Sequence, residues 1–390
     1  MTGIVGRIKF GLMAGTAAIA ASAGQAQAKE PIEIGMAVAL TGYLASFDGQ
    51  LVDGVKLMAD KLNAEGGIDG HKIDIHVLDD ASNATAGVTD TNQLLNEYNV
   101  SVMINGLSSA QNAAIEPILE RTKVPQLDGS VLPPDPKWAF DINLLDDRPD
   151  ALEVDYANQL HAKTVALVFS QTPYGQHAAE FMRARAEKLG MKIVYSQAVE
   201  PSVTDMSAQM AALKAVAPDV VIDKLTGSTH IVEGKAAETV GLKIPIVLDP
   251  DDLPTLEKTV AAYPNSVFVA SAPIAYPHIA DRGTKDACAS FIAAYTKTGQ
   301  TLAAISGVTV GWDGVRILAK AIETAGGATG GDKLRDALEH TTVQGCNSLY
   351  KYSASDHYGQ LDVPNEVQIA RIERGKVVIV YSERELKLAE

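Results

Sequence analysis

The sequence lacks the short motifs by which most enzyme classes are recognised. It has no G-x-S-x-G turn for a nucleophilic serine, no G-x-x-x-x-G-K-[ST] phosphate loop and no G-x-G-x-x-G after its first apolar strand pattern. Its eight histidines are scattered, without an H-E-x-x-H motif or the paired Cys/His spacing of a zinc site. We therefore expect no enzyme, no cofactor and no metal site. An exported enzyme is kept as an alternative, because catalytic groups need not be local in sequence.

Basic clusters and aromatic residues are also scarce. Lys and Arg number 33 against 48 Asp and Glu, which gives a net charge of −15. A chain without a basic patch is not expected to bind nucleic acid or an anionic membrane surface. Aromatic residues make up only 5% of the chain, which favours an Ala/Val/Leu-rich α/β core over an all-β core.

Long apolar runs are missing as well, since the candidate near the start, Phe10–Ala21, is too short to span a bilayer. It follows the basic residues Arg7 and Lys9 and precedes Ala26-Gln27-Ala28, an A-x-A cleavage site. This order is that of a secretory signal peptide. We therefore expect residues 1–28 to be removed after Ala28 and the protein to be periplasmic.

Cysteine is nearly absent, with Cys288 and Cys346 as the two in the chain. An exported protein meets an oxidising compartment, where a disulfide is allowed. The sequence does not tell whether the two Cα atoms come within bridging distance, so a disulfide and two small buried residues are equal alternatives. The length left after removal of the signal peptide suggests two domains of ordinary size.

The first stretch after the signal peptide has the pattern of a βαβ unit. Apolar residues alternate from Ile32 to Val38, recur every three to four residues from Asp48 to Gly66-Gly67, and alternate again from Ile73 to Val77. These periods predict a strand, a helix and a parallel strand joined by a right-handed crossover. Ligands of open parallel sheets bind beyond the carboxyl ends of the strands, so residues 40–48 are expected to form a binding loop.

The alternation of strands and helices continues along the chain and restarts near residue 164, after a polar connection. It predicts parallel sheets with helices on both faces, in two α/β lobes, and spacing alone indicates two consecutive domains. Further strands are expected at residues 100–104, 124–127, 164–169, 192–196, 220–222 and 244–248, with a closing hairpin at 366–372 and 377–381. Residues 267–272 are expected to run back toward the first lobe. Further helices are expected at residues 84–98, 108–121, 174–189, 206–216, 231–240, 284–295, 302–325 and 332–340.

Several stretches carry a resemblance to a known family: LTGYLASFDGQ, INGLSSAQ, TPYGQHAAEFMR, GWDGVRILAKAIETAG and YSASDHYG. In this order and spacing they resemble the type I periplasmic binding proteins, in particular the branched-chain amino acid-binding (Leu/Ile/Val-binding) family of ABC transporter substrate-binding proteins. The resemblance covers nearly the whole chain after the signal peptide. It implies two doubly wound parallel-sheet lobes joined by a three-crossing hinge. The N-terminal lobe would hold residues 29–143 and 274–353, and the C-terminal lobe residues 144–273 and 354–390.

The resemblance also implies a function. Such a protein is a periplasmic monomer that captures a small carboxylate, either an amino acid or an aromatic or keto acid, by hinge closure. It then delivers this ligand to an ABC permease in the inner membrane. A ligand sensor without transport is one alternative, and an exported enzyme using the same cleft is another. Turnover of a bound compound would separate an enzyme from a binding protein.

Ser108 and Ser109 stand where a predicted strand runs into a helix. The first turn of a helix leaves backbone N–H groups unpaired and carries partial positive charge, so it can hold a ligand carboxylate beside these hydroxyls. The alternative is that both serines only cap the helix. The family resemblance favours the carboxylate site.

Gly129 and Ser130 follow the next strand, at an edge where the family commonly places small and hydroxyl residues ending in Thr. Leu132 falls about where that Thr would be, and its side chain cannot form a hydrogen bond. A ligand ammonium without this partner would be costly to desolvate. Leu132, together with Trp138 and the DHYG ending, therefore favours an aromatic or keto acid over an amino acid.

Five further residues complete the expected ligand site. Tyr43 and Phe47 lie in the first binding loop, and Tyr174 starts a second-lobe helix where the family closes a tyrosine ring over the ligand. Thr226 follows another strand end. Asp251 follows the next one, where the family often keeps an acidic residue facing a ligand ammonium. The alternatives are that Phe47 staples its helix and that Asp251 is a helix N-cap.

Two residues near these stretches are expected to be structural. Lys224 comes directly after an apolar strand, and we expect it to offset Asp223 at the surface rather than reach the cleft. His357 lies in Ser355-Asp356-His357-Tyr358-Gly359, where the Asp and Gly indicate a turn with a hydrogen-bonded histidine.

Overall fold

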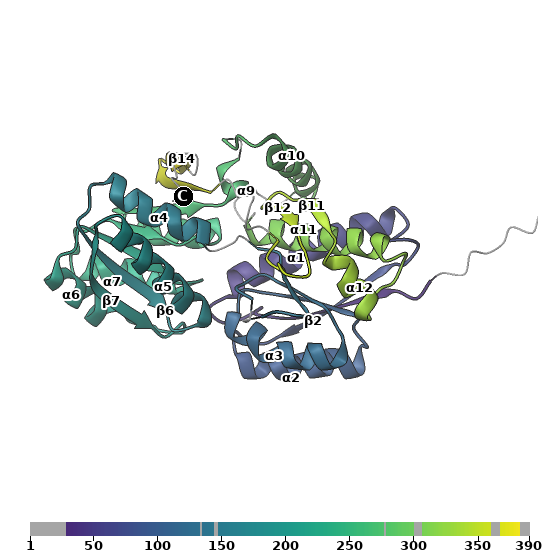
Figure 1. Ribbon diagram of the computed structural model, residues 1–390. Coiled ribbons are helices and arrows are strands. Elements are labelled where there is room, and N and C mark those ends of the chain that lie inside the picture. The colour runs from purple at the N-terminus through teal and green to yellow at the C-terminus, as the bar shows by residue number, and fades with distance from the viewer. Residues whose placement is uncertain are drawn as a thin grey trace, which may run out of the picture.

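A computed structural model describes residues 29–132, 135–143, 147–276, 278–299, 306–359 and 367–382. The expected signal peptide lies outside these residues, as do the first residues expected for the helix at 302–325 and the strand at 366–372. The described chain forms two lobes, each built on its own sheet and covered by helices (Figure 1). The predicted α/β class with two largely parallel sheets is confirmed.

The first sheet has five parallel strands in the order β2-β1-β3-β4-β5. These are β1 (Ile32–Val38), β2 (Ile73–Asp79), β3 (Val102–Asn105), β4 (Gln126–Asp128) and β5 (Ala139–Asp141). The predicted βαβ unit begins this sheet, with Ile32 paired to Ile73 and Val38 paired to Asp79. The carboxyl ends of all five strands therefore meet at one edge, as the binding-loop argument requires.

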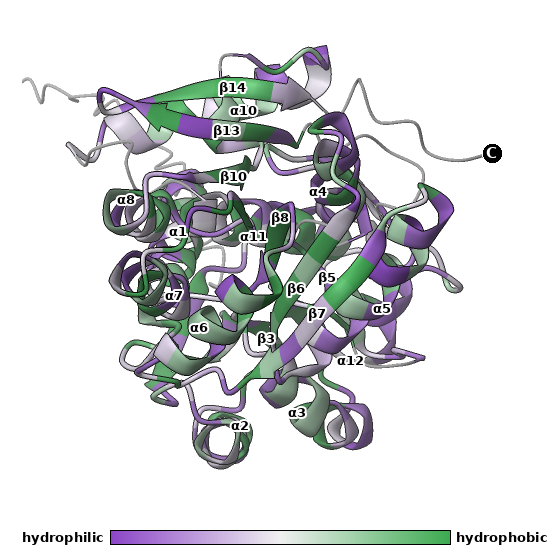
Figure 2. Ribbon diagram, turned by 90° about the vertical axis from the view of Figure 1, so that its left-hand side faces the viewer, coloured by the Kyte–Doolittle hydropathy of each residue, from purple (hydrophilic) through white to green (hydrophobic). Residues whose placement is uncertain are grey.

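The second sheet has seven strands in the order β14-β13-β10-β9-β8-β6-β7. These are β6 (Thr164–Ser170), β7 (Lys192–Val199), β8 (Val220–Lys224), β9 (Ile246–Leu248), β10 (Ser266–Ala270), β13 (Gln368–Glu373) and β14 (Lys376–Ser382). The strands β6 to β10 pair in parallel, and β13 and β14 add the predicted antiparallel hairpin at one edge. At the other edge, β7 carries mixed hydropathy beside the more hydrophobic β6 (Figure 2).

Helices cover both sheets. Those on or beside the first sheet are α1 (Ala45–Ala64), α2 (Ala84–Glu97), α3 (Ser109–Thr122), α10 (Arg282–Thr296), α11 (Ser306–Thr324) and α12 (Gly331–Leu338). Those beside the second sheet are α4 (Asp147–Gln159), α5 (Pro173–Lys188), α6 (Ser207–Val216), α7 (Thr229–Thr239) and α8 (Leu253–Ala262). The short α9 (Ala272–Ala275) contacts elements of both lobes.

The helices α1 and α11 approach each other closely through glycines. A Cβ atom on Gly54 would lie 2.0 Å from the carbonyl oxygen of Val308, and one on Gly311 would lie 2.1 Å from that of Leu51. Any larger residue would push the two helices apart. This close packing fixes the start of α11 relative to α1, and both helices contribute residues to the pocket described below.

The chain passes between the two sheets three times. It leaves the first sheet after β5, returns after β10, and leaves again after a hairpin of β11 (Thr342–Gln344) and β12 (Leu349–Lys351). Two consecutive domains are therefore excluded, because α10 to α12 follow the second sheet in sequence but pack with the first lobe. The residue boundaries expected for the two lobes remain a prediction.

Several elements escape the sequence patterns, among them α4 and the hairpin of β11 and β12. The buried residues of α4 include the carboxylates Asp150, Glu153 and Asp155 beside apolar ones such as Leu152 and Val154, so the apolar stripe that marks a helix is interrupted. The strands β11 and β12 are three residues each, which is too short for an alternating pattern to be visible.

Cys288 and Cys346 form a disulfide with their Cα atoms 4.4 Å apart, so the first of the two alternatives for these residues is correct. The bond joins α10 to the loop between β11 and β12. In the part of the chain that the structure describes, no helix combines the length and the apolar character needed to cross a membrane.

Candidate functional site

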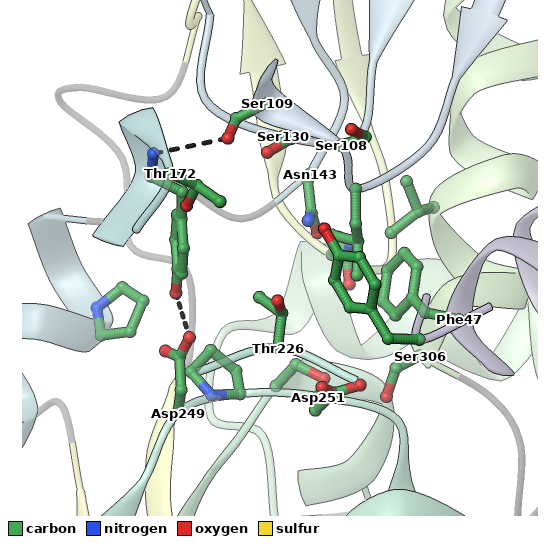
Figure 3. Close-up of a pocket in the computed structure, with 18 of the residues that line it drawn as sticks. Phe47, Ser108, Ser109, Ser130, Asn143, Thr172, Thr226, Asp249, Asp251 and Ser306 are labelled. Carbon is green, nitrogen blue, oxygen red and sulfur yellow. Dashed lines mark hydrogen bonds between the residues drawn. The ribbon is translucent and has the colours of Figure 1, made fainter. Parts of the chain in front are cut away.

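A pocket lies between the two lobes, and its empty space is about 820 Å³, including space open to solvent. Figure 3 shows Ser108, Ser109 and Ser130 on one side of it and Asp249 and Asp251 on the opposite side. The predicted site residues that line it are Tyr43, Phe47, Ser108, Ser109, Ser130, Tyr174, Thr226 and Asp251. Its lining combines aromatic rings with a few polar side chains, which is typical of a small-molecule site.

Ser108 and Ser109 bring the start of α3 to the pocket wall. Ser108 is the N-cap of this helix, because its Oγ accepts a hydrogen bond from the Gln111 amide at 3.4 Å. The same residue lines the pocket, so capping and ligand contact are compatible. The first turn of a 14-residue helix thus presents its positive end at the wall, where it suits a carboxylate.

Asp48 fixes the loops behind this wall. Its carboxylate accepts hydrogen bonds from the backbone N–H groups of Ala39 and Leu107, each at 3.0 Å. Because Ala39 follows β1 and Leu107 follows β3, one buried side chain holds two strand ends together. Burial raises the pKa of Asp48 to about 7, even though these two hydrogen bonds oppose the shift. Gly106 leaves room for the carboxylate, since a Cβ there would lie 2.3 Å from it.

The opposite wall rests on a buried lysine. Lys224 is 1% exposed, and its Nζ lies 2.8 Å from Asp150 and 3.5 Å from Glu153 and pairs with Asp249. Asp249 lines the pocket and accepts a hydrogen bond from the Tyr174 hydroxyl. Burial lowers the pKa of Lys224, but the carboxylates outweigh it and raise the pKa well above its usual value. The expectation of a surface Lys224 was wrong, because α4 supplies buried carboxylates that the sequence pattern did not show.

Asp251 is held in place from three directions. It accepts hydrogen bonds from the backbone N–H groups of Gly227 and Asp252, both at 2.6 Å, and lies 3.4 Å from His230 Nε2. The other ring nitrogen of His230 is 2.9 Å from Asp223. Burial lowers the pKa of His230, but the two carboxylates outweigh it and raise the pKa well above its usual value. The N-cap of α8 is Asp252, which leaves Asp251 to line the pocket.

The two lobes touch across the pocket. The Ser228 amide donates to the Tyr43 carbonyl at 3.1 Å, and the Tyr174 amide donates to Ser109 Oγ at 3.4 Å (Figure 3). Gly227 lies so close to the first lobe that a Cβ on it would be 2.0 Å from the Tyr43 carbonyl oxygen. The lobes are therefore in a closed arrangement around the pocket.

Gly129 is the predicted site residue that does not line the pocket. Its amide donates to the Asn105 carbonyl at 3.0 Å, and its carbonyl accepts from Asn143 Nδ2 at 2.8 Å. These bonds fix the strand end from which the next residue, Ser130, reaches the pocket.

The residues that favoured an aromatic or keto acid are not among those lining the pocket. Leu132 is buried, and Trp138 lies beneath the Arg335 guanidinium at 5.3 Å. His357 stacks on Phe140 and contacts a backbone carbonyl at 2.9 Å, which confirms the expected structural turn. These positions remove the basis for the preference.

Sequence reasoning missed several residues of the lining, which are Leu107, Ala110, Asn143, Pro149, Thr172, Asp249, Pro250, Ser271, Ser306, Val310 and Asn347. Thr172, Asp249 and Ser271 come within two residues of a strand end, so the rule that selected Thr226 would have found them. The start of α11 and the β11–β12 loop carry no such signal. Over the described residues, no three His, Cys, Asp or Glu side chains are grouped to hold a metal ion.

The sequence pattern of a family described as "Periplasmic binding protein" matches residues 31–376. An amino acid binding protein from Pseudomonas aeruginosa is 29% identical over 49% of this chain and 52% of its own length. A Leu/Ile/Val-binding protein from Rhizobium johnstonii is 27% identical over 49% of this chain and 53% of its own length. The chain thus spans about half the length of these two relatives. A Leu/Ile/Val-binding protein homologue from Brucella suis is 22% identical over 92% of this chain and 93% of its own.

Solved structures share the fold. A Rhodopseudomonas palustris protein superposes with a TM-score of 0.81 at 19% identity, covering 90% of this chain and 99% of that chain. An ABC transporter solute-binding protein from R. palustris in complex with benzoate superposes with a TM-score of 0.75 at 15% identity. The match covers 90% of this chain and 96% of that chain. A branched-chain amino acid transporter substrate-binding protein from Streptococcus pneumoniae in complex with isoleucine superposes with a TM-score of 0.75 at 21% identity. The match covers 90% of this chain and 99% of that chain.

Proposed function

Because the chain belongs to the periplasmic binding protein family, we propose that it is the solute-binding protein of an ABC importer. It binds a small carboxylate between its lobes in the periplasm, and the closed monomer delivers this ligand to an inner-membrane permease. The family consists of substrate-binding proteins rather than enzymes, so no turnover of the ligand is expected. The observation that carries the proposal is the start of α3, with Ser108 and Ser109, at the wall of a pocket between the lobes.

An amino acid is the ligand that the charges around the pocket support best. Asp249 and Asp251 are the charged side chains among the described residues that line it. The cations behind them, Lys224 and His230, are already paired with carboxylates. Each of these cations faces more than one carboxylate, so this side of the pocket keeps more carboxylates than cations. An amino acid brings its own ammonium to it, whereas a ligand with only a carboxylate does not. We therefore favour an amino acid, against the preference drawn from the sequence.

An aromatic acid is the second candidate. The rings of Tyr43, Phe47 and Tyr174 line the pocket and offer flat apolar faces. The likeness to a solute-binding protein solved with benzoate supports the same candidate. An amino acid and an aromatic acid both carry a carboxylate, so either ligand would bind this group at the start of α3.

Titration calorimetry with matched pairs decides between the two ligand classes. Each pair joins an amino acid to its keto acid, such as phenylalanine with phenylpyruvate, and benzoate is added as the aromatic acid. We expect the amino acid to bind at least tenfold more tightly, a difference of about 1.4 kcal/mol. Tighter binding of the keto acid or benzoate would select the aromatic acid, and binding of none of these carboxylates would overturn the proposed function.

Uptake by intact cells separates import from sensing. A strain from which the gene is deleted should lose high-affinity uptake of the labelled ligand. Retained uptake combined with a lost chemotactic response would instead identify a sensor.

A further inference from the structure

Two hydroxyl groups of the pocket lining have no hydrogen-bond partner among the described residues. Ser271 and Ser306 are 8% and 5% exposed, and both line the pocket. The Oγ atom of each is closed off from solvent and is unpaired among the residues that the structure describes. An unpaired buried hydroxyl destabilises the fold, because it has lost its hydrogen bonds to water without replacing them.

Neither hydroxyl serves the local backbone. Ser271 occupies the N-cap position of α9, yet its side chain makes no cap hydrogen bond. Three other N-cap residues of the chain, Ser108, Thr172 and Asp252, do bond to the first turn of their helices. The two unpaired hydroxyls thus differ from the structural hydroxyls of this fold. Because both residues line the pocket, each hydroxyl can reach a ligand there by rotation about its Cα–Cβ bond.

The two serines belong to different parts of the pocket wall. Ser271 directly follows β10, where the chain leaves the second sheet, and Ser306 begins α11, which packs along α1 in the first lobe. Figure 3 shows Ser306 at the far side of the pocket from Ser108 and Ser109. A ligand whose carboxylate is held at the start of α3 therefore directs its other end toward Ser306.

Resting on the proposed function, we infer that the ligand carries a second, uncharged group that forms a hydrogen bond with the hydroxyl of Ser306, of Ser271 or of both. A hydroxyl or a carboxamide has this chemistry. A second carboxylate does not suit the site, because the charged residues of the described lining, Asp249 and Asp251, are acidic. The preferred ligand is thus a hydroxylated or amide-bearing small acid rather than one with a purely aliphatic side chain.

The experiment compares pairs of probes that differ in this one group. The mature protein is titrated by calorimetry with L-threonine and L-valine, with L-asparagine and L-leucine, and with para-hydroxybenzoate and benzoate. We expect the polar member of at least one pair to bind tenfold more tightly or better, since a site that hydrogen-bonds a ligand group rejects the analogue lacking it. In the double variant Ser271→Ala and Ser306→Ala, the preference should disappear.

A stability measurement separates a ligand contact from a structural role. The ligand-free double variant should melt at the same temperature as the wild type or higher, because it removes unpaired buried hydroxyls. Ser290→Ala, at an exposed serine of α10, is the matched control and should keep the preference. If the double variant does not fold, each single variant is titrated instead, and at least one of them should reduce the preference.

The outcomes distinguish this inference from the proposed function. Equal binding within every pair, or a preference that survives in the double variant, overturns the inference while the proposed function stands. A lower melting temperature of the double variant assigns the hydroxyls to the fold and also overturns it. Binding of none of these probes, and of neither phenylalanine nor phenylpyruvate, overturns the proposed function and the inference with it.

Discussion

Single side chains at the pocket serve both the fold and the candidate site. Ser108 caps α3 and lines the pocket, and Asp48 holds two strand ends together directly behind the wall. A substitution at either position therefore changes stability and binding at once. A test of binding at these positions therefore needs a control that changes stability alone.

Replacing Ser108 and Ser109 together by Ala should weaken ligand binding by about 1–3 kcal/mol, because hydrogen bonds to a charged carboxylate are lost. Calorimetry measures this change. Asn83→Ala is the matched control, since Asn83 caps α2 through two backbone amides and is not part of the lining. The control should lose about 1 kcal/mol of stability and keep its affinity. Unchanged affinity in a folded double variant would exclude the start of α3 as the carboxylate site.

Asp48 should lower the free energy of unfolding as the pH rises from about 4 to about 7. Its pKa is about 7 in the folded protein against an ordinary value of 3.8, so the folded state binds the extra proton in this window. The stabilisation is complete at the acidic end and is lost as the pH passes the folded pKa. Asp48→Asn should remove about 2 kcal/mol of the stability difference between pH 5 and pH 7.

Urea denaturation at these two pH values measures the effect. Asp60→Asn is the control, because Asp60 lies on the same helix and is exposed. Its pH dependence should match that of the wild type. Parallel curves for Asp48→Asn and the wild type would show that the carboxylate of Asp48 does not hold a proton preferentially in the folded state.

At the scale of elements, α4 is held to the second sheet partly by charge. Its carboxylates Asp150 and Glu153 contact Lys224 at the end of β8, and Lys224 continues to Asp249 at the pocket wall. A buried pair of this kind destabilises strongly when one partner is removed, because the other charges stay buried without compensation. The wall of the pocket and the docking of α4 therefore depend on the same lysine.

Lys224→Met should reduce the free energy of unfolding by about 3–5 kcal/mol at pH 7. Urea denaturation checks the loss. Adding Asp150→Asn to the variant should recover part of it, since one uncompensated carboxylate is then neutral. A Lys224→Met protein as stable as the wild type would mean that the buried carboxylates are neutral without the lysine.

The sequence patterns predict the elements whose buried faces are apolar. The βαβ unit from Ile32 onward and the hairpin around Arg374-Gly375 both follow from residue periodicity. The same patterns miss α4, whose buried residues include carboxylates, and misplace Lys224, whose partners come from that missed helix. Local pattern contains no information on a buried ion pair between distant segments.

The sequence patterns likewise predict some residues of the candidate site and miss others. The strand-end rule selects Ser108 and Thr226, because each follows a strand within its own βα unit. Ser306 and Asn347 reach the pocket only because the chain returns to the first lobe after β10. That return is a property of the topology, and the sequence offered it only through a family resemblance.

At the scale of the whole molecule, the contacts between lobes join the ligand to closure. The hydrogen bonds from Ser228 to Tyr43 and from Tyr174 to Ser109 link loops that also line the pocket. A ligand that contacts both walls should shift the population toward this closed arrangement, because it interacts with both lobes only there. A substitution that prevents close approach of the lobes should then weaken binding without touching the ligand.

Gly227→Ala is such a substitution. Its Cβ would lie 2.0 Å from the carbonyl oxygen of Tyr43 in the opposite lobe, so it opposes closure. The φ of +58° at Gly227 adds backbone strain, which is present whether the lobes are open or closed. We expect the variant to bind the ligand at least tenfold more weakly, a loss of about 1.4 kcal/mol. Its radius of gyration by small-angle scattering, at saturating ligand, should exceed that of the wild type.

Gly241→Ala separates closure from strain. Gly241 has a similar φ of +64°, and the nearest atom to its added Cβ is the flexible Lys214 Nζ at 3.6 Å, within the same lobe. This control should therefore lose stability from the backbone alone and keep both the affinity and the radius of gyration of the wild type. If both variants bind as tightly as the wild type, the closed arrangement is not the ligand-bound form. If both lose affinity equally, backbone strain rather than contact between the lobes accounts for the loss.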